Sequence, residues 1–228
     1  MTTCAMKRSI FVLTLTLVRP GLVLATAPDE SEQGLVQCAN LIYGRNKTSV
    51  CFSDGFLEQI SKDTNVRAAP RLRQVKLESA ELYEYPFTVM TGEGKFTLTE
   101  AQRENLRNYL FHGGFLVASG GCSSKPWNES FGAEIARIFP QRKLDRLGAD
   151  HPAFHTVYDI VTSRFKSGGS RLPVLKGLDI DGKTVLIWSP EGLNDTASVG
   201  GDCCCCGGNE IKSAQKINVN LLAYALTH

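Results

Sequence analysis

Four consecutive cysteines are the most chemically distinctive feature of this sequence. Cys203, Cys204, Cys205 and Cys206 lie between two glycine pairs, directly before the last helical segment. Adjacent Cα atoms are about 3.8 Å apart, below the roughly 4.4 Å that a disulfide needs, so neighbours in this run do not pair with one another. The run therefore predicts either ligands for a metal ion, disulfides to distant cysteines, or free thiols.

Zinc is the metal that the cysteine run suits best, because tetrahedral Zn²⁺ accepts Cys and His ligands. An iron–sulfur cluster fits an exported protein less well, since oxidants reach it there. His151 and His155 are the candidate nitrogen ligands, because a spacing of four places both on one face of a helix. The alternatives are disulfides from the run to Cys38, Cys51 or Cys122, and a helix start whose histidines bond the backbone.

Two acidic positions are candidates for binding a ligand. Gly92, Glu93 and Gly94 place an acid between two glycines, which lets the backbone approach a bound molecule. Asn209 and Glu210 stand at the N-terminus of the expected final helix, whose dipole favours an acid. Ordinary loop chemistry is the alternative in both places.

Hydrophobic patterning predicts alternating strands and helices. Thr99 and Gln102 form a capping box, and Asp181-Gly182 is a hairpin signal. The final helix is expected over 209–226. The expected strands are 39–43, 74–77, 87–91, 115–119, 178–181 and 184–189, and the other expected helices are 53–65, one that opens at Thr99, and one around 131–139.

Continuous apolar strands between helices predict an α/β fold, a mostly parallel sheet with helices on both faces. Ligands of such sheets bind at the carboxyl ends of the strands. The segments that leave the strands contain Glu93, Cys122, the stretch from His151 to His155, and the stretch from Asp202 to Glu210 with its four cysteines. Cys51 precedes the first helix and should lie at the same edge. We therefore expect all of these groups at one edge of the sheet.

Composition narrows the class of protein. The chain has 228 residues, 43% hydrophobic and 21% charged, which is typical of a globular protein with a substantial core. The formal net charge of +2 gives no basic field for nucleic acid. No later apolar run is long enough to predict a permanent membrane span.

The first 27 residues have the layout of a secretory signal peptide. Lys7 and Arg8 precede a short apolar segment over 10–18, and Ala25 to Ala27 supplies a small-residue cleavage pattern. We expect export, followed by a linker over 28–37 and one domain over 38–228. Cleavage removes one of the eight cysteines and leaves an odd number, so at least one is free, intermolecular or metal-bound.

Several motifs together resemble the bacterial family called domain of unknown function 4159. They are YPFTVMTGEG over 85–94, HGGFL over 112–116, DHPAFH over 150–155 and GNEI over 208–211, followed by the asparagine-rich final helix. The resemblance covers about residues 39–228. It implies a flavodoxin-like fold similar to the class I glutamine amidotransferase superfamily, and no established activity.

That superfamily carries its nucleophile where Cys122 stands, directly after a buried strand. Gly120 and Gly121 would permit the sharp turn that a nucleophile needs. After Cys122, the sequence departs from the pattern of that superfamily. Serines replace the expected glycine, and no His-x-Glu pair follows downstream. His155 with Asp159 is the substitute base that the sequence offers, and a disulfide or metal role for Cys122, or a plain core thiol, is the alternative.

Three functional hypotheses follow. The first is an exported domain that binds a metal or a small ligand at the carboxyl edge of its sheet, through a cluster of Cys203 to Cys206 with His151 and His155. The second is a cysteine-dependent hydrolase or amidotransferase-like enzyme with Cys122 as nucleophile. The third is an interaction module stapled by disulfides.

Overall fold

The computed structural model describes residues 34–45, 52–195 and 210–228. The run from Cys203 to Cys206, Cys51, Asn209 and the expected signal peptide lie outside these residues. In the described part of the chain, no helix is long and apolar enough to cross a membrane.

A seven-stranded sheet forms the centre of the domain, in the order β2-β1-β3-β4-β9-β8-β5. Its first five members run parallel, whereas β8 is antiparallel to both β9 and β5. A separate two-stranded ribbon pairs β6 with β7. The strands are β1 (Cys38–Ile42), β2 (Arg73–Lys76), β3 (Phe87–Gly92), β4 (Phe115–Gly120), β5 (Asp145–Arg146), β6 (Ser163–Arg164), β7 (Ser170–Arg171), β8 (Lys176–Ile180) and β9 (Lys183–Ser189).

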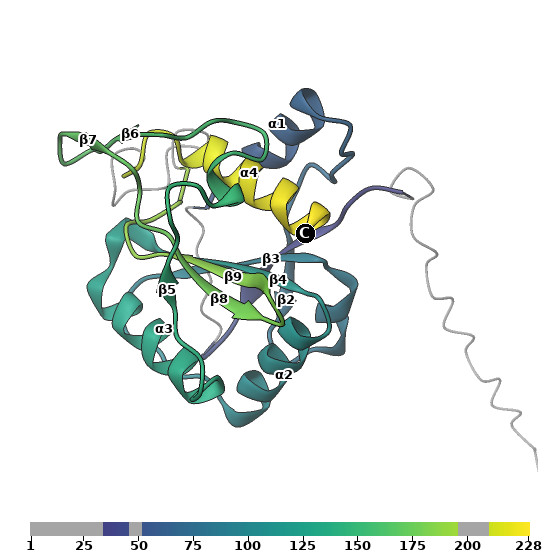
Figure 1. Cartoon of the computed structure of the whole chain (residues 1–228). Coiled ribbons are helices and arrows are strands. Elements are labelled where there is room, and N and C mark those ends of the chain that lie inside the picture. Colours follow the sequence, from purple (N-terminus) through teal and green to yellow (C-terminus); the bar gives the residue numbers. More distant parts are fainter. Residues whose placement is uncertain (1–33, 46–51, 196–209) are drawn as a thin grey trace, which may run out of the picture. The chain divides into compact units, whose positions relative to one another are not determined.

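Helices cover both faces of the sheet, as Figure 1 shows, with α1 and α4 on one face and α2 and α3 on the other. In the described residues, the α-helices are α1 (Gly55–Asp63), α2 (Glu100–Phe111), α3 (Lys125–Ile138) and α4 (Ala214–Thr227), and the short 3₁₀ helices are η2 (Ala80–Glu84), η3 (Gly121–Ser123) and η4 (Pro152–Phe154). The expected α/β class with a mostly parallel sheet is confirmed.

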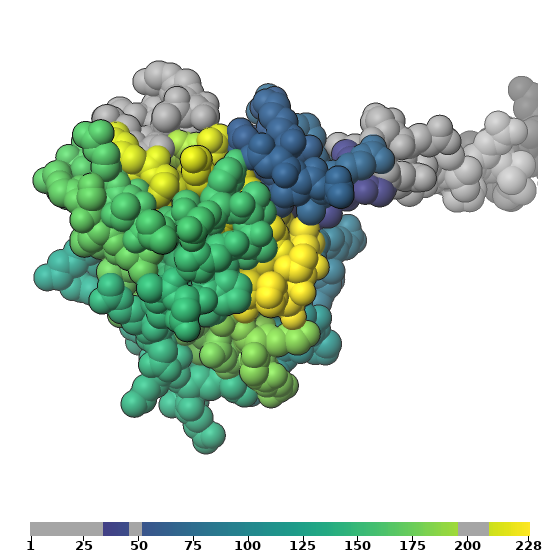
Figure 2. Space-filling view, turned by 45° about the horizontal axis from the view of Figure 1, so that its top comes forward, coloured from purple at the N-terminus to yellow at the C-terminus, as the bar shows by residue number. Residues whose placement is uncertain are grey.

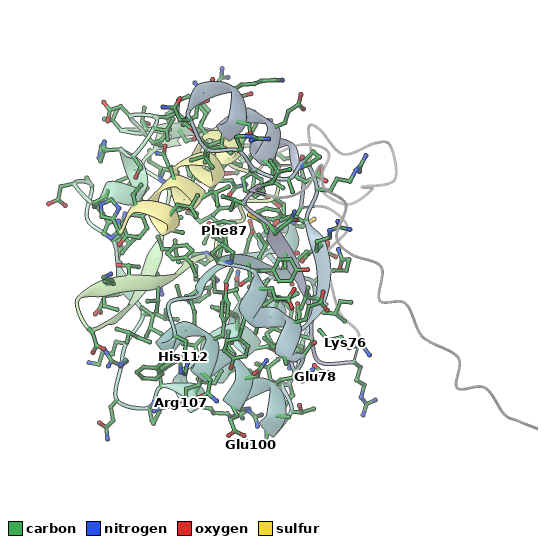
Figure 3. The ribbon with its side chains drawn as sticks, turned by 90° about the vertical axis from the view of Figure 1, so that its right-hand side faces the viewer. Lys76, Glu78, Phe87, Glu100, Arg107 and His112 are labelled. Atoms are coloured by element: carbon green, nitrogen blue, oxygen red, sulfur yellow. The ribbon has the colours of Figure 1, made fainter. Side chains whose placement is uncertain are left out.

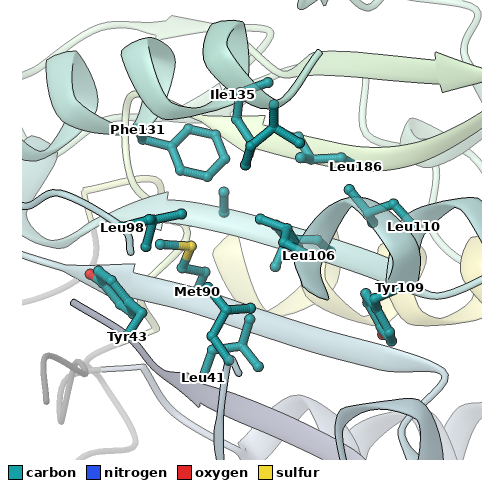
Figure 4. Packing of buried hydrophobic residues seen from close by; sticks show 14 of the residues in the cluster. Leu41, Tyr43, Met90, Leu98, Leu106, Tyr109, Leu110, Phe131, Ile135 and Leu186 are labelled. Carbon is teal, nitrogen blue, oxygen red and sulfur yellow. The ribbon is translucent and has the colours of Figure 1, made fainter. Parts of the chain in front are cut away.

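Each strand divides its side chains between two cores, because successive residues point to opposite faces. In β3, Phe87 and Val89 pack toward α1 and α4, and Met90 packs toward α2 and α3. Figure 4 shows Met90 with Leu106 of α2 and Phe131 of α3. Figure 3 shows Phe87 on the α4 side of the sheet. Burial on both faces explains the continuous apolar strands of the sequence.

Local signals set several element ends. The Thr99 Oγ1 accepts a hydrogen bond from the Gln102 N–H, and the Gln102 side chain bonds back to Thr99, so the predicted capping box is confirmed. Asp181 and Gly182 have φ of 51° and 80° in the turn between β8 and β9, which confirms the predicted hairpin. Figure 2 shows α1 beside α4, on the face of the sheet that these two helices cover.

The expected helix around 131–139 begins earlier than predicted, at Lys125. Ser124 caps it by accepting from the Trp127 N–H, and Pro126 occupies its first turn. Proline suits this place because the first turn leaves its N–H groups unpaired anyway. Likewise, the stretch from His151 to His155 forms only the three-residue η4, with His151 before it and His155 after it.

Candidate functional site

The carboxyl ends of β3, β4 and β9 lie level with one another. Gly92 pairs with Gly120 across β3 and β4, and Ser119 pairs with Ser189 across β4 and β9. The residues that follow these strands therefore meet at one edge, which we call the carboxyl rim. The structure brings Glu93, Cys122 and Glu210 together there.

The Glu210 carboxylate lies directly on the backbone of the rim. A Cβ added to Gly192 would come within 2.7 Å of Glu210 Oε2 and within 3.2 Å of the Gly120 carbonyl oxygen. Glycine at 192, with φ of +90°, is therefore what lets the carboxylate approach. Oε2 is buried and, within the described ranges, has no hydrogen-bond partner.

Burial raises the pKa of Glu210 above its usual value of 4.5, and the nearby Glu93 carboxylate raises it further. The Glu210 backbone N–H and the Lys166 ammonium act in the opposite direction. A buried acceptor without a donor is costly, so the site favours a bound group that supplies a donor or a positive charge.

Glu93 lies over a second glycine in the same way. A Cβ added to Gly121 would meet Glu93 Cγ at 3.0 Å and Glu93 Oε1 at 3.3 Å. The Cys122 Sγ is 3.5 Å from Glu93 Oε1. Two glycines at the strand ends thus admit two carboxylates to the same rim.

The turn after β4 has a strained backbone. Cys122 and Ser123 have φ of 50° and 52°, the left-handed region that non-glycine residues seldom adopt. Such a conformation persists only when surrounding contacts hold it. The Ser123 hydroxyl donates to the Glu191 carbonyl at 2.8 Å, and Cys122 is disulfide-bonded.

Buried asparagines fix the loop that follows β9. The Leu193 N–H donates to the Ser119 Oγ at 2.7 Å, and that hydroxyl donates to Asn194 Oδ1 at 2.7 Å. Asn218 of α4 donates its Nδ2 to the Leu193 carbonyl at 3.0 Å. Sequence reasoning did not single out Asn194 or Asn218 for a role. For Asn218, the available signal was a polar residue within the apolar pattern of the final helix.

The segment before α4 is fixed by backbone pairing. The Lys166 N–H donates to the Glu210 carbonyl and the Lys212 N–H donates to the Arg164 carbonyl, both at 2.9 Å, with a bridge between Phe165 and Ile211. This pairing holds the backbone of Glu210 beside that of Lys166.

A pocket of about 560 Å³ opens beside this pairing; we call it the rim pocket. The Arg171 guanidinium stacks over the Phe165 ring at 3.9 Å and pairs with the Glu191 carboxylate. The Val174 N–H also donates to Glu191, at 2.7 Å. Besides Phe165, Arg171 and Glu191, the residues that line the pocket include Ser123, Lys166 and Glu210.

The two histidines lie away from the carboxyl rim, contrary to the expectation. The His151 Nε2 is 3.3 Å from the Thr184 hydroxyl, and its ring lies 5.4 Å from that of Tyr224. Thr184 is at the start of β9, about 17 Å along the strand from Ser189 at the rim. The chain turns back after β5, so the rule for strand ends does not apply to this stretch.

The ring nitrogens of both histidines already have partners. His151 Nδ1 accepts from the Ala153 N–H at 3.1 Å, and burial lowers the His151 pKa. His155 Nδ1 is 2.5 Å from Asp159 Oδ1, and its Nε2 is 2.6 Å from the Ala149 carbonyl. The structure forms the predicted His155–Asp159 pair but does not bring it to Cys122.

The metal site that the sequence predicts involves residues beyond the described ranges. Cys203, Cys204, Cys205, Cys206 and Asn209 lie outside them. Among the residues that the structure describes, no three His, Cys, Asp or Glu side chains lie close enough to hold a metal ion. Cys38, in β1, is buried and free.

Comparison with known proteins identifies the family. Residues 37–226 match the family described as "Domain of unknown function (DUF4159)". No curated protein matches the chain significantly. Because the match spans most of the sequence, the chain belongs to the DUF4159 family.

Proposed function

We propose that this domain binds a small polar ligand at the carboxyl rim, in the rim pocket, with Glu210 as the main acceptor. The observation that carries the proposal is the buried Oε2 of Glu210, which has no hydrogen-bond partner among the described residues, in a residue that lines a 560 Å³ pocket. Native proteins pair nearly all buried polar atoms, so an exception beside a pocket points to a missing partner.

The polar groups of the rim define the chemistry of that ligand. Glu210 Oε2 and the Gly120 carbonyl oxygen both lie against Gly192, and both are acceptors. They suit an ammonium group, a hydroxyl group or a metal cation. Lys166, which acts on the charge of Glu210, suits an acceptor elsewhere on the same molecule.

The strand order supports a finer classification of the fold within this proposal. The parallel strands follow the order β2-β1-β3-β4-β9, which is the 2-1-3-4-5 order of flavodoxin-like folds. Such folds bind ligands at the carboxyl ends of their strands, where the rim pocket lies. We include a flavodoxin-like fold related to the class I glutamine amidotransferases in the proposal.

Thermal denaturation with three probes tests the ligand proposal. Ethanolamine, glycerol and Zn²⁺ each supply one of the three kinds of partner named above. We expect at least one probe to raise the melting temperature saturably in the wild type and not in Glu210→Gln. Glu104→Gln, an exposed acid on α2, serves as the matched control and should respond like the wild type. The proposal fails if no probe stabilises the wild type, or if both variants respond alike.

A zinc site at Cys203 to Cys206 remains a separate proposal. It is supported by the sequence alone, and neither His151 nor His155 has a ring nitrogen without a partner to offer it. Elemental analysis of protein from its native compartment should find stoichiometric zinc that is lost when the four cysteines become serine. Absence of metal with at most one free thiol would instead support a disulfide-stapled module.

Export is likewise proposed from the sequence. The positive residues, short apolar segment and small-residue pattern of the first 27 residues support it. Immunoblotting of cell fractions should find a shortened chain outside the cytoplasm. A full-length chain confined to the cytoplasm would overturn the proposal.

A cysteine-dependent enzyme is the second candidate function, and the backbone of Cys122 favours it. A left-handed residue two positions after a buried strand exposes its side chain on a sharp turn, as nucleophile turns do. Glu93, 3.5 Å from the sulfur, replaces His155 as the group beside it. Because Cys122 is disulfide-bonded, its thiolate would form only after reduction. Selective alkylation of Cys122 by iodoacetamide at neutral pH after mild reduction would support this candidate, and modification no faster than that of a denatured-state thiol would contradict it.

A further inference from the structure

The carboxyl edge contains a second pocket, which shares no lining residue with the rim pocket. It has a volume of about 600 Å³ and lies between the residues that follow β1, those that follow β3, and one side of α3. Gly44 and Arg45 come from the first, Lys95 and Phe96 from the second, and Ser130 and Arg137 from the third. We call it the switch-point pocket.

Its place in the topology is where an α/β sheet gathers ligands. The chain leaves β1 for β2 on one side, and leaves β3 for β4 on the other, although β1 and β3 are neighbours. At such a reversal the two connections separate and leave a crevice at the carboxyl ends of the strands. The switch-point pocket opens at that crevice.

Positive charge without a carboxylate partner faces this pocket. Arg45 and Lys95 have no ion-pair partner among the described residues. The two acidic residues that line the pocket already have ion-pair partners. Glu134 pairs with Arg103 and with Arg137 at 2.7 Å each, and Glu129 lies 3.8 Å from Lys125. The charge left over is therefore positive, which suits an anion.

Hydrogen bonds hold the pocket's walls in place before any ligand arrives. The Gly44 N–H donates to Gln102 Oε1 at 3.2 Å. Two hydrogen bonds fix the loop after β3. The hydroxyl of Ser124, the N-cap of α3, accepts from the Gly94 N–H, and the hydroxyl of Ser130 in α3 accepts from the Phe96 N–H. Beneath the loop, the Phe96 ring packs against Tyr43 and Trp127 at centroid distances of 4.9 and 5.6 Å. A site fixed in this way loses little entropy on binding.

We propose that the switch-point pocket binds a small oxyanion, with Arg45 and Lys95 as its charged ligands. Phosphate, free or as an ester, is the group that this chemistry recognises. The volume leaves room for an organic portion beside the anion. Arg137 contributes positive charge from the opposite wall while it stays paired with Glu134.

Calorimetric titration with inorganic phosphate tests this site. We expect saturable binding in the wild type, weakened about tenfold or more in Arg45→Gln and in Lys95→Gln, since each loses one charged contact. Both side chains are exposed, so neither variant threatens the fold. Lys183→Gln, an exposed lysine at the start of β9, is the matched control and should bind like the wild type. Glu210→Gln should also bind normally, which separates this proposal from the one for the rim pocket.

A second titration distinguishes the sources of the anion. If glycerol 3-phosphate binds more tightly than phosphate, the site takes a phosphate ester. If the two bind equally, it takes the free anion. Absence of saturable phosphate binding, or equal weakening in Lys95→Gln and Lys183→Gln, would overturn the proposal.

Discussion

Glu210 Oε2 lies 2.7 Å from the point that a Cβ of Gly192 would occupy. A larger residue at 192 would displace the carboxylate, and its φ of +90° would be strained for any side chain. Glu93 also lies against a glycine, because a Cβ of Gly121 would come within 3.0 Å of Glu93 Cγ and 3.3 Å of its Oε1. At both places, the absence of a side chain on the glycine lets a carboxylate lie against the backbone of the carboxyl rim. The rim therefore presents carboxylate oxygens as hydrogen-bond acceptors for a ligand.

The first prediction concerns the pH dependence of stability at Glu210. Its folded pKa lies above the unfolded value of 4.5, so its contribution is fully present below that value and is lost as the pH rises through the folded pKa. Without ligand, Glu210→Gln should therefore melt a few degrees higher than the wild type at about pH 7.5, and like it at about pH 4. Thermal denaturation at both values measures this. If Glu210→Gln melted lower than the wild type at neutral pH, the ionised Glu210 carboxylate would be stabilised by its surroundings and not destabilised by burial.

The second prediction concerns His155, whose pKa is raised by the Ala149 carbonyl and then by Asp159. A raised pKa gives stability that is present below the usual value of 6.5 and is lost as the pH rises through the folded value. His155→Gln should therefore lower the melting temperature more at about pH 5.5 than at about pH 8.5. An equal loss at both values would contradict a charged pair with Asp159.

The third prediction concerns Gly92, at the end of β3. A Cβ there would come within 2.3 Å of the Tyr43 hydroxyl and 2.9 Å of Trp127 Nε1, two groups that share a 2.5 Å hydrogen bond. Gly92→Ala should cost about 1–3 kcal/mol through overpacking, measured by denaturant unfolding. Gly132→Ala is the control, because its nearest neighbour is Trp188 at 3.9 Å and alanine favours a helix by about 1 kcal/mol. If both variants were equally stable, the close packing of Gly92 would be disproved.

The fourth prediction concerns Asn220 of α4. Its Oδ1 accepts from the N–H groups of Val157 and Tyr158 at 3.0 and 2.8 Å, and its Nδ2 donates to the Tyr158 carbonyl. Asn220→Ala leaves these groups unpaired, at a cost of about 1–3 kcal/mol. Hydrogen exchange should also become faster at the amides of Val157 and Tyr158. Unchanged protection at both amides would mean that another group holds this loop.

The fold was predictable where the signal is local. The capping box at Thr99 and the turn at Asp181-Gly182 depend on residues within a few positions, and both formed as expected. The start of α3 was missed because the prediction followed the apolar pattern from Phe131 onward. The helix-start signals of Ser124, its N-cap, and Pro126, in its first turn, were not used. The two-residue strands such as β5 are too short to produce any pattern, since pairing with a neighbour defines them.

The candidate site was predictable where a strand delivers a residue directly to the rim. Glu93 and Cys122 follow strand ends, so topology alone places them. His151 does not, because a reversal of the chain after β5 carries it to the start of β9. The unpaired Oε2 of Glu210 and the glycine beneath it depend on three-dimensional packing that no sequence pattern encodes.

The most direct test of the account is to observe where a ligand binds. An amide NMR titration of the protein, with whichever of ethanolamine, glycerol or Zn²⁺ stabilises it, reports on each backbone N–H. We predict saturable shifts centred on Gly120, Gly121, Gly192 and Glu210, which disappear in Glu210→Gln and persist in Glu104→Gln. Shifts confined to other parts of the domain, or shifts that survive in Glu210→Gln, would contradict a ligand site at the carboxyl rim.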